Sequence, residues 1–228
     1  MKFGTAKWPY FTAQFPMKNK FLSRALTLLV LLIIPLLFFF YYKQKIDQLP
    51  KRADKIPVLY EAPSFKFATE YGDTLTADSL KGKLYVADFI FSSCESVCPN
   101  LSKVMAQIQQ NFIANPQLRL VSFSIDPARD SAAALRDYAA RYGAVRGKWY
   151  FLHGDTSQVR TIVENGFKVS VGYAQDSTEA AGYTFTHSSD LLLVDGKGQI
   201  RGIYNGIDST DVSALYNNLG LLIAAKNL

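Results

Sequence analysis

Cys94 and Cys98 are the only cysteines in the 228-residue chain, and the residues around them constrain its fold. The mostly apolar stretch from Leu84 to Phe91 predicts a buried strand. Pro99, followed by apolar residues at helical spacing, predicts a helix directly after the pair. The two thiols therefore stand where a strand turns into a helix, and at this spacing they face the same way. Such a pair can form a structural disulfide, a redox switch or part of a metal site.

The order of strands and helices predicts an α/β domain with a mixed central sheet. Further strands are expected over residues 64–67, 118–125, 149–152, 190–194 and 199–204, the last two joined as a hairpin. Further helices are expected over residues 131–142, with Asp130 as its cap and Gly143 as its end, from 155 or 156 to 166, and from about 209 to 225. A thiol pair after the first core strand, at a helix N-terminus, indicates the thioredoxin-like arrangement.

An uncharged segment runs from Ala25 to Tyr42, just long enough to cross a hydrocarbon core of roughly 30 Å. A cleaved signal peptide is the competing interpretation, but it requires a small-residue cleavage site after a shorter apolar region. The aromatic run Phe38–Tyr42 followed by Lys43 instead fits an interfacial belt and an uncleaved anchor. We expect a tail over 1–24, an anchor over 25–42, a tether over 43–57 and one folded domain over 58–228.

The formal charge of +6 is not spread over the chain. Residues 1–55 hold ten Lys and Arg against two Asp, which leaves 15 basic and 17 acidic residues in the rest. A near-neutral domain argues against nucleic acid as a partner. Basic residues are equal in number on the two sides of the apolar segment, so charge does not set the orientation. Long C-terminal domains translocate largely regardless of charge, and we expect the domain on the outer face of the membrane, with the tail in the cytoplasm.

Partial positive charge at a helix N-terminus favours thiolate at Cys94 and Cys98. Thiolates are nucleophiles in disulfide exchange and soft ligands for copper, zinc or iron–sulfur clusters. Two sulfurs do not complete a zinc or iron–sulfur cluster site, so a third ligand matters, and the chain has two histidines, His153 and His187. Either can be a solvated loop residue, and we keep that interpretation for His153. In a thioredoxin-like fold His187, just ahead of the hairpin, can reach the cysteine loop.

Several motifs together resemble the Sco/SenC family of membrane-anchored copper chaperones. The resemblance covers most of the domain and includes the CxxxC-Pro motif, the segment Ser124-Ile125-Asp126-Pro127-Ala128-Arg129-Asp130, the aromatic run Trp149–Leu152 and the position of His187. It implies a thioredoxin-like fold and a copper ion bound by Cys94, Cys98 and His187. It also implies a role in assembling the binuclear copper site of cytochrome c oxidase, by copper delivery or by reduction of that site's cysteines.

The resemblance also implies partners and a location. The partners are the copper-bearing subunit of cytochrome c oxidase or other copper proteins, and the membrane through the N-terminal helix. The location is the bacterial inner membrane, with the domain on the periplasmic side, ahead of the mitochondrial inner membrane. Glu95 and Ser96 depart from the family's usual loop after the first cysteine, and Ser92 and Ser93 from the residues before it.

Two carboxylates have open roles in the sequence. Asp126 lies near the site or caps the turn before Pro127. Asp88 is an outward-facing strand residue or a buried carboxylate that accepts protons from the thiols.

The main alternative to a metallochaperone is a membrane-tethered thiol–disulfide oxidoreductase with Cys94 and Cys98 as its redox-active pair. Thioredoxin-type reductases place a cis-proline opposite the cysteines, whereas this chain has no proline after Pro127. A structural disulfide is disfavoured because so short a loop gains little stabilisation from closure. A peroxidase fits poorly, since the usual Pro and Thr ahead of the cysteine are missing.

Overall fold

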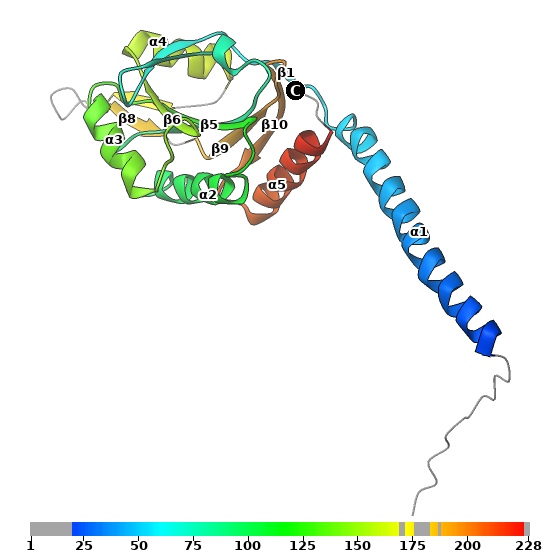
Figure 1. Ribbon diagram of the computed structural model, residues 1–228. Coiled ribbons are helices and arrows are strands. Elements are labelled where there is room, and N and C mark those ends of the chain that lie inside the picture. The colour runs from blue at the N-terminus through cyan, green and yellow to red at the C-terminus, as the bar shows by residue number, and fades with distance from the viewer. Residues whose placement is uncertain (1–19, 169–171, 176–182, 187, 226–228) are drawn as a thin grey trace, which may run out of the picture. The chain divides into compact units, whose positions relative to one another are not determined.

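The computed structural model describes residues 20–168, 172–175, 183–186 and 188–225, and Figure 1 shows its helices and strands. The chain divides into two compact units, Met1–Asp47 and Gln48–Leu228. The first unit holds most of one long helix, and the second holds the central sheet with the other helices.

The long helix, α1 (Lys20–Ala53), contains the apolar segment expected to cross a membrane. Its residues Lys20–Gln48 are long and apolar enough to do so, since 29 residues at about 1.5 Å each exceed a core of roughly 30 Å. Its apolar side chains are exposed, with Leu28 at 65% and Phe39 at 60%, as suits a lipid environment. The helix continues to Ala53, so most of the segment expected as a tether is helical.

The second unit is built on one eight-stranded mixed sheet, which confirms the predicted α/β class. Its strand order is β1-β10-β9-β4-β5-β6-β2-β3. Two neighbouring pairs in this sheet are parallel, β4 with β5 and β5 with β6, and the other pairs are antiparallel. The strands are β1 (Tyr60–Glu61), β2 (Lys66–Thr69), β3 (Thr74–Thr76), β4 (Leu84–Ile90), β5 (Leu118–Ser124), β6 (Trp149–His153), β9 (Asp190–Val194) and β10 (Gln199–Asn205).

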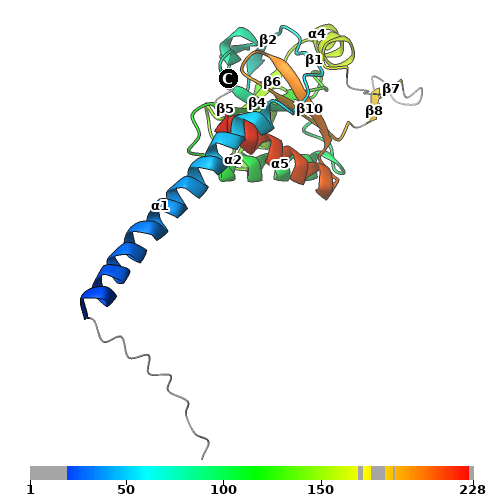
Figure 2. The same cartoon turned by 90° about the vertical axis from the view of Figure 1, so that its right-hand side faces the viewer.

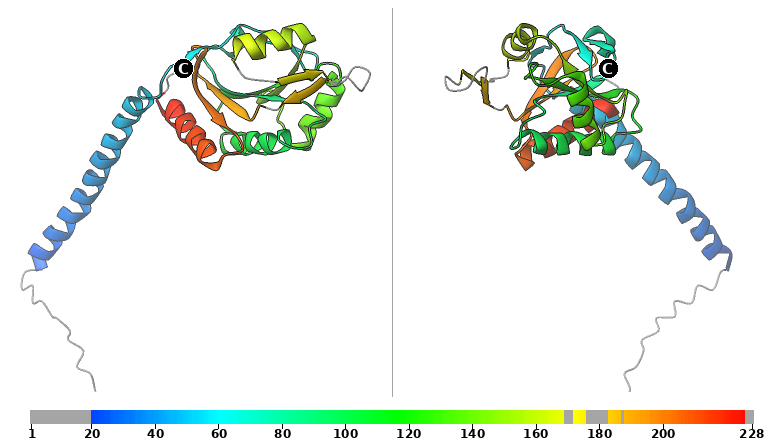
Figure 3. Two further views of the ribbon diagram at one scale, coloured as in Figure 1. Left: turned by 180° about the vertical axis from the view of Figure 1, so that it is seen from behind. Right: turned by 90° about the vertical axis from the view of Figure 1, so that its left-hand side faces the viewer.

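Helices cover both faces of the sheet. They are α2 (Cys98–Asn111), α3 (Ala132–Arg141), α4 (Thr156–Arg160), which continues as a π-helical turn (Thr161–Gly166), and α5 (Ser209–Ala224), with a short 3-10 turn at Asp78–Leu80. Figures 1, 2 and 3 show α2 and α5 along one face and α4 on the opposite face. Because parallel strands covered on both faces are fully buried, β4 has no exposed residue.

Strand alternation divides the core between these two faces. Phe89 on β4 and Phe123 on β5 stack on one face with 5.7 Å between ring centroids, and Phe167, after the π-helical turn, packs against both. The side chain of Asp88 points to the other face, which α2 covers. There Trp149 on β6 donates a hydrogen bond to Ser122 on β5, and Ser102 on α2 pairs with Tyr138 on α3.

The predicted elements are present, with one strand and one helix cap shifted and one hairpin added. The strand expected over 64–67 is β2, two residues further on, where it pairs with β3 around the Tyr71–Asp73 turn. The cap of α3 is Ser131, whose hydroxyl accepts from the N–H of Ala134, and not Asp130, whose carboxylate is used elsewhere. The strands β7 (Gly172–Gln175) and β8 (Tyr183–Thr186) form a hairpin that short strands of mixed pattern do not predict.

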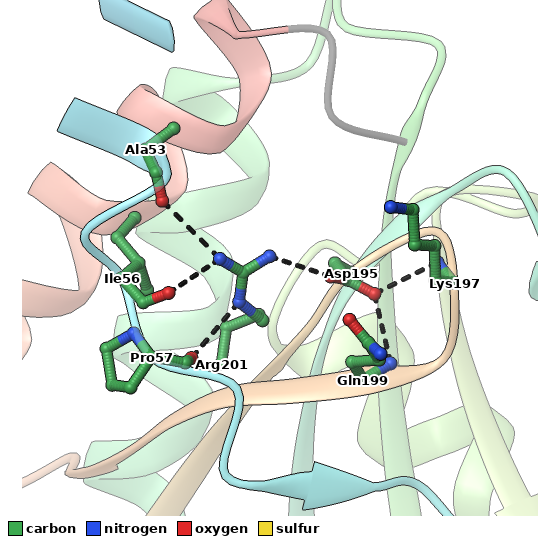
Figure 4. A network of polar contacts seen from close by, with 7 residues as sticks. All are labelled: Ala53, Ile56, Pro57, Asp195, Lys197, Gln199 and Arg201. Carbon is green, nitrogen blue, oxygen red and sulfur yellow. Dashed lines mark hydrogen bonds and ion pairs between the residues drawn. The ribbon is translucent and has the colours of Figure 1, made fainter. Parts of the chain in front are cut away.

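Residues 53–57 lie on the sheet, held by one buried arginine of β10 (Figure 4). Arg201 forms an ion pair of 2.8 Å with Asp195 and donates to the carbonyls of Ile56 at 2.6 Å and Pro57 at 3.1 Å. The carbonyl of Ala53 accepts at 3.4 Å. Asp195 also closes the β9–β10 turn by accepting from the N–H groups of residues 197 and 199. One guanidinium thus joins this segment to the hairpin.

Candidate dithiol and metal site

The cysteine loop is short and connects the end of β4 to the start of α2. The N–H of Cys94 donates to the carbonyl of Phe91 at 3.1 Å, which closes a turn directly after the strand. Helix α2 then begins at Cys98, with Pro99 in its first turn as predicted. Val97 caps this helix without a side-chain hydrogen bond, so the N–H groups at the start of α2 have no side-chain cap. The sulfur of Cys94 accepts one of them, the N–H of Cys98, at 3.4 Å.

Neither cysteine is in a disulfide, and both are buried, with exposures of 7% at Cys94 and 2% at Cys98, yet their thiols differ in acidity. Burial by itself raises the pKa of Cys94, but the Cys98 thiol and the backbone N–H groups of residues 96–98 outweigh it, and the net pKa is lowered. The pKa of Cys98 is raised, chiefly by burial and then by its hydrogen bond to Cys94. The expected stabilisation of the thiolate therefore holds for Cys94, and the expectation was wrong for Cys98.

Asp88 lies beneath this loop on β4 and is completely buried, so the outward-facing interpretation was wrong. Burial raises the pKa of its carboxyl to about 7, and the Ser122 hydroxyl across the strand pair offsets only part of this. Neither oxygen has a hydrogen-bond partner of good geometry among the described residues. The charge of Asp88 contributes to the raised pKa of Cys98, which places a second proton-binding group beside the dithiol. The nearly continuous apolar run around Asp88 is the sequence signal that could have indicated its burial, because such runs are typical of strands covered on both faces.

The loop after β5 reaches the same edge of the sheet, because the carboxyl ends of the parallel strands β4 and β5 lie together. The N–H of Ile125 donates to the carbonyl of Ile90 at 2.9 Å. The carbonyl of Asp126 accepts from the N–H groups of Arg129 and Asp130, which forms a tight turn. Burial raises the pKa of the Asp126 carboxyl, against the lowering effect of Arg129 at 3.5 Å. These contacts favour the turn role for Asp126.

Asp130 is the residue of this loop whose role the sequence interpretation missed. Its carboxylate is fully buried and accepts hydrogen bonds from the Ser92 N–H and hydroxyl and from the Ser124 hydroxyl. Ser92 belongs to the cysteine loop, so one carboxylate joins the two loops. A serine two residues before the first cysteine, together with a serine at the end of the next strand, was the available signal.

Of the two histidines, the structure describes His153 but not His187. His153 ends β6 and pairs with Ala68 of β2, so it is a half-buried strand residue and not the solvated loop residue that we expected. Within the described part of the chain, no three His, Cys, Asp or Glu residues gather as a metal site. His187 lies outside the described residues. The strand that follows it, β9, runs antiparallel to β4, so its first residue, Asp190, arrives at the edge where β4 ends.

The fold and the site define a class: an α/β domain of thioredoxin type with a reduced pair of cysteines between its first core strand and the following helix, preceded by an apolar helix. Residues 54–218 match the SCO1/SenC family model, and the chain belongs to this family.

The chain is similar to the "SCO1 protein homolog" of Bacillus subtilis, with 33% identity over 158 residues that cover 68% of this chain and 79% of the relative. A "putative copper-binding protein" of Stutzerimonas stutzeri is 25% identical over 142 residues, which cover 61% of this chain and 67% of the relative. A solved structure of BsSco superposes on this chain with a TM-score of 0.62. That structure is described as identifying a disulfide switch in BsSco, a member of the Sco family of cytochrome c oxidase assembly proteins. It is 30% identical, and the match covers 75% of this chain and 96% of that one. The resemblance and the thioredoxin-like fold predicted from the sequence are thus confirmed.

Proposed function

We propose that this protein is a copper-binding assembly factor whose ligands are Cys94, Cys98 and His187. Its client is the binuclear copper site of cytochrome c oxidase, to which it delivers copper or whose cysteines it reduces. The observation that carries the proposal is the pair of thiols at the N-terminus of α2, which form no disulfide and are hydrogen-bonded to each other. The names of two relatives support it, one "putative copper-binding protein" and the other a member of the Sco family of cytochrome c oxidase assembly proteins.

The donor set fits copper by its chemistry. Thiolate sulfur is soft and selects cuprous copper, and imidazole binds copper in either oxidation state. Cys94 is ready to coordinate because its thiolate is already stabilised by N–H donors. Cys98 holds its proton more tightly and must release it when a ligand bond forms. The arrival of β9 at the cysteine edge supports a third ligand from the residues just ahead of that strand.

The second candidate is a membrane-tethered thiol–disulfide oxidoreductase. The unequal pKa values of the two thiols favour it, because the more acidic Cys94 would attack a disulfide as the thiolate. Cys98 would then lose its proton and, as a thiolate, displace the client's sulfur from the mixed disulfide. The disulfide switch described for BsSco is a further reason to keep this candidate. In either role, reduction of one client disulfide would convert the two thiols to one Cys94–Cys98 disulfide and release two protons and two electrons to the client.

The placement in the cell is part of the proposal. The apolar helix would cross the bacterial inner membrane once, with residues 1–24 in the cytoplasm, 25–42 as the anchor and 43–57 as the tether. The domain over 58–228 would then lie on the periplasmic side, where a client with its copper site outside the membrane can be reached.

Copper titration of the reduced domain, followed by absorption spectroscopy, tests the ligand set. We expect wild type to bind one copper ion with a sulfur-to-copper charge-transfer band, and His187→Ala to lose affinity and change the band. His153→Ala is the matched control and should leave both unchanged. An unchanged His187→Ala protein would remove His187 from the ligand set. Wild type that binds no copper but reduces disulfides would favour the oxidoreductase.

A further inference from the structure

We infer that Asp130 is a positioning residue that holds the cysteine loop in its reactive geometry. Its donors come from two neighbouring elements of the sheet edge. Ser92, in the cysteine loop, donates its N–H at 3.1 Å and its hydroxyl, and Ser124, at the end of β5, donates its hydroxyl at 2.5 Å. The inference rests on the proposed function where it predicts copper affinity, but not where it predicts the reactivity of the Cys94 thiol.

The carboxylate is itself held rigidly, which a positioning residue requires. Its side chain has no exposed surface. Its backbone N–H closes the tight turn to the carbonyl of Asp126 at 2.9 Å, and the next residue, Ser131, caps α3. The turn and the donor on β5 thus fix where both carboxylate oxygens point. Because it binds Ser92 with two groups at once, the carboxylate sets both the position and the orientation of that residue.

The position of Ser92 is transmitted to the thiol through one short turn. Ser92 lies inside the turn from Phe91 to Cys94, which the hydrogen bond between those two residues closes. That turn carries the Cys94 sulfur to the N–H of Cys98 and to the other amides that lower its pKa. These contacts weaken steeply with distance and angle, so a small shift of Ser92 moves the sulfur away from its donors.

Neutral donors suit this role better than a cation would. An arginine or lysine at the position of Ser92 would place a positive charge beside the thiols and copper ligands. Two hydroxyls and one amide instead satisfy a buried carboxylate without adding a charge to the loop. An asparagine side chain has one acceptor oxygen, and its NH2 group would face a donor that the second carboxylate oxygen now accepts from. Asp130→Asn therefore removes part of this hydrogen bonding with little change in side-chain size.

The experiment measures iodoacetamide labelling of Cys94 against pH in the reduced, metal-free protein. Four variants are compared with wild type: Asp130→Asn, Ser92→Ala, Ser124→Ala and Asp195→Asn, the last a buried carboxylate remote from the loop. We expect the labelling midpoint to rise by about one pH unit in Asp130→Asn and by less in Ser92→Ala, since a displaced Cys94 thiolate would lose the hydrogen bond from the Cys98 N–H and a hydrogen bond to a charged group has about this size. Ser124→Ala should shift it least, and Asp195→Asn should lower stability without any shift.

A second measurement separates this inference from the proposed function. Copper affinity should fall in Asp130→Asn and Ser92→Ala in the same order as the labelling shift, and Ser92→Ala serves as the milder variant if Asp130→Asn does not fold. If both variants lose only stability, as Asp195→Asn does, Asp130 is a folding residue and the inference is overturned. If the labelling midpoint shifts while wild type binds no copper, the positioning role holds and the proposed copper function fails.

Discussion

Asp88 is a buried carboxyl beside the dithiol, and its burial lowers the stability of the fold. Its carboxyl lies on the α2 side of β4 with no exposed surface, close enough to Cys98 to affect that thiol's pKa. An apolar residue at this place would favour folding, because burying a carboxylate without good hydrogen bonds is costly. The sequence located Asp88 in a strand but left its direction open, since alternation cannot be read in a run that is buried on both faces.

Asp88→Asn is expected to stabilise the reduced, metal-free domain at neutral and alkaline pH. The folded-state pKa is about 7 and the ordinary value is 3.8, so the folded chain retains a proton that the unfolded chain releases between these values. The contribution of Asp88 is therefore fullest below about pH 4 and is lost as pH rises through 7. Above pH 7 the variant should gain up to about 4 kcal/mol in free energy of unfolding.

Urea unfolding at pH 5 and pH 8 measures this gain, with Asp78→Asn as the exposed control. Equal stability of wild type and Asp88→Asn at pH 8 would contradict the buried, proton-binding role of this carboxyl.

At the scale of elements, two adjacent residues at the start of α3 have different roles. Asp130 and Ser131 are both good caps, and the sequence interpretation chose Asp130. In the structure Ser131 accepts from Ala134 at 3.2 Å, while Asp130 turns toward Ser92 and Ser124. The partners of Asp130 are 38 and 6 residues away in sequence, so local cap preferences could not reveal them.

Ser131→Ala should therefore lower the free energy of unfolding by about 1 kcal/mol, the usual cost of a lost cap. The same variant should leave the reactivity of Cys94 unchanged, because the Ser131 hydroxyl is bound within α3. Chemical unfolding and Cys94 alkylation at one fixed pH measure the two effects. A change in alkylation as large as that of Asp130→Asn would show that the two residues act as one unit.

At the scale of the whole molecule, the order of the central strands and helices was predictable because each has a clear apolar period and a clear boundary. Three features were not. The β7–β8 hairpin has short strands, the edge position of β1 depends on pairing with a strand about 140 residues later, and the Arg201 contacts join segments 145 residues apart. Long-range pairings of this kind leave no local pattern in the sequence.

Arg201→Met tests how firmly residues 53–57 belong to the domain. The change leaves Asp195 buried without its cation and removes donors from two close carbonyls, so it should cost about 3–5 kcal/mol in free energy of unfolding. Trypsin should also cut after Lys55 much faster than in wild type. Arg146→Met breaks an exposed pair with Asp73 and should cost less than about 1 kcal/mol. Equal losses in the two variants would contradict a structural role for the Arg201 network.

X-ray absorption at the copper edge, on the copper-loaded full chain, tests most directly whether the dithiol at the start of α2 is a copper site. We predict two sulfur atoms in the coordination shell of wild type, together with one imidazole nitrogen, and one sulfur in Cys94→Ser and in Cys98→Ser. A wild-type shell of nitrogen and oxygen alone, unchanged in both variants, would contradict the assignment of Cys94 and Cys98 as copper ligands.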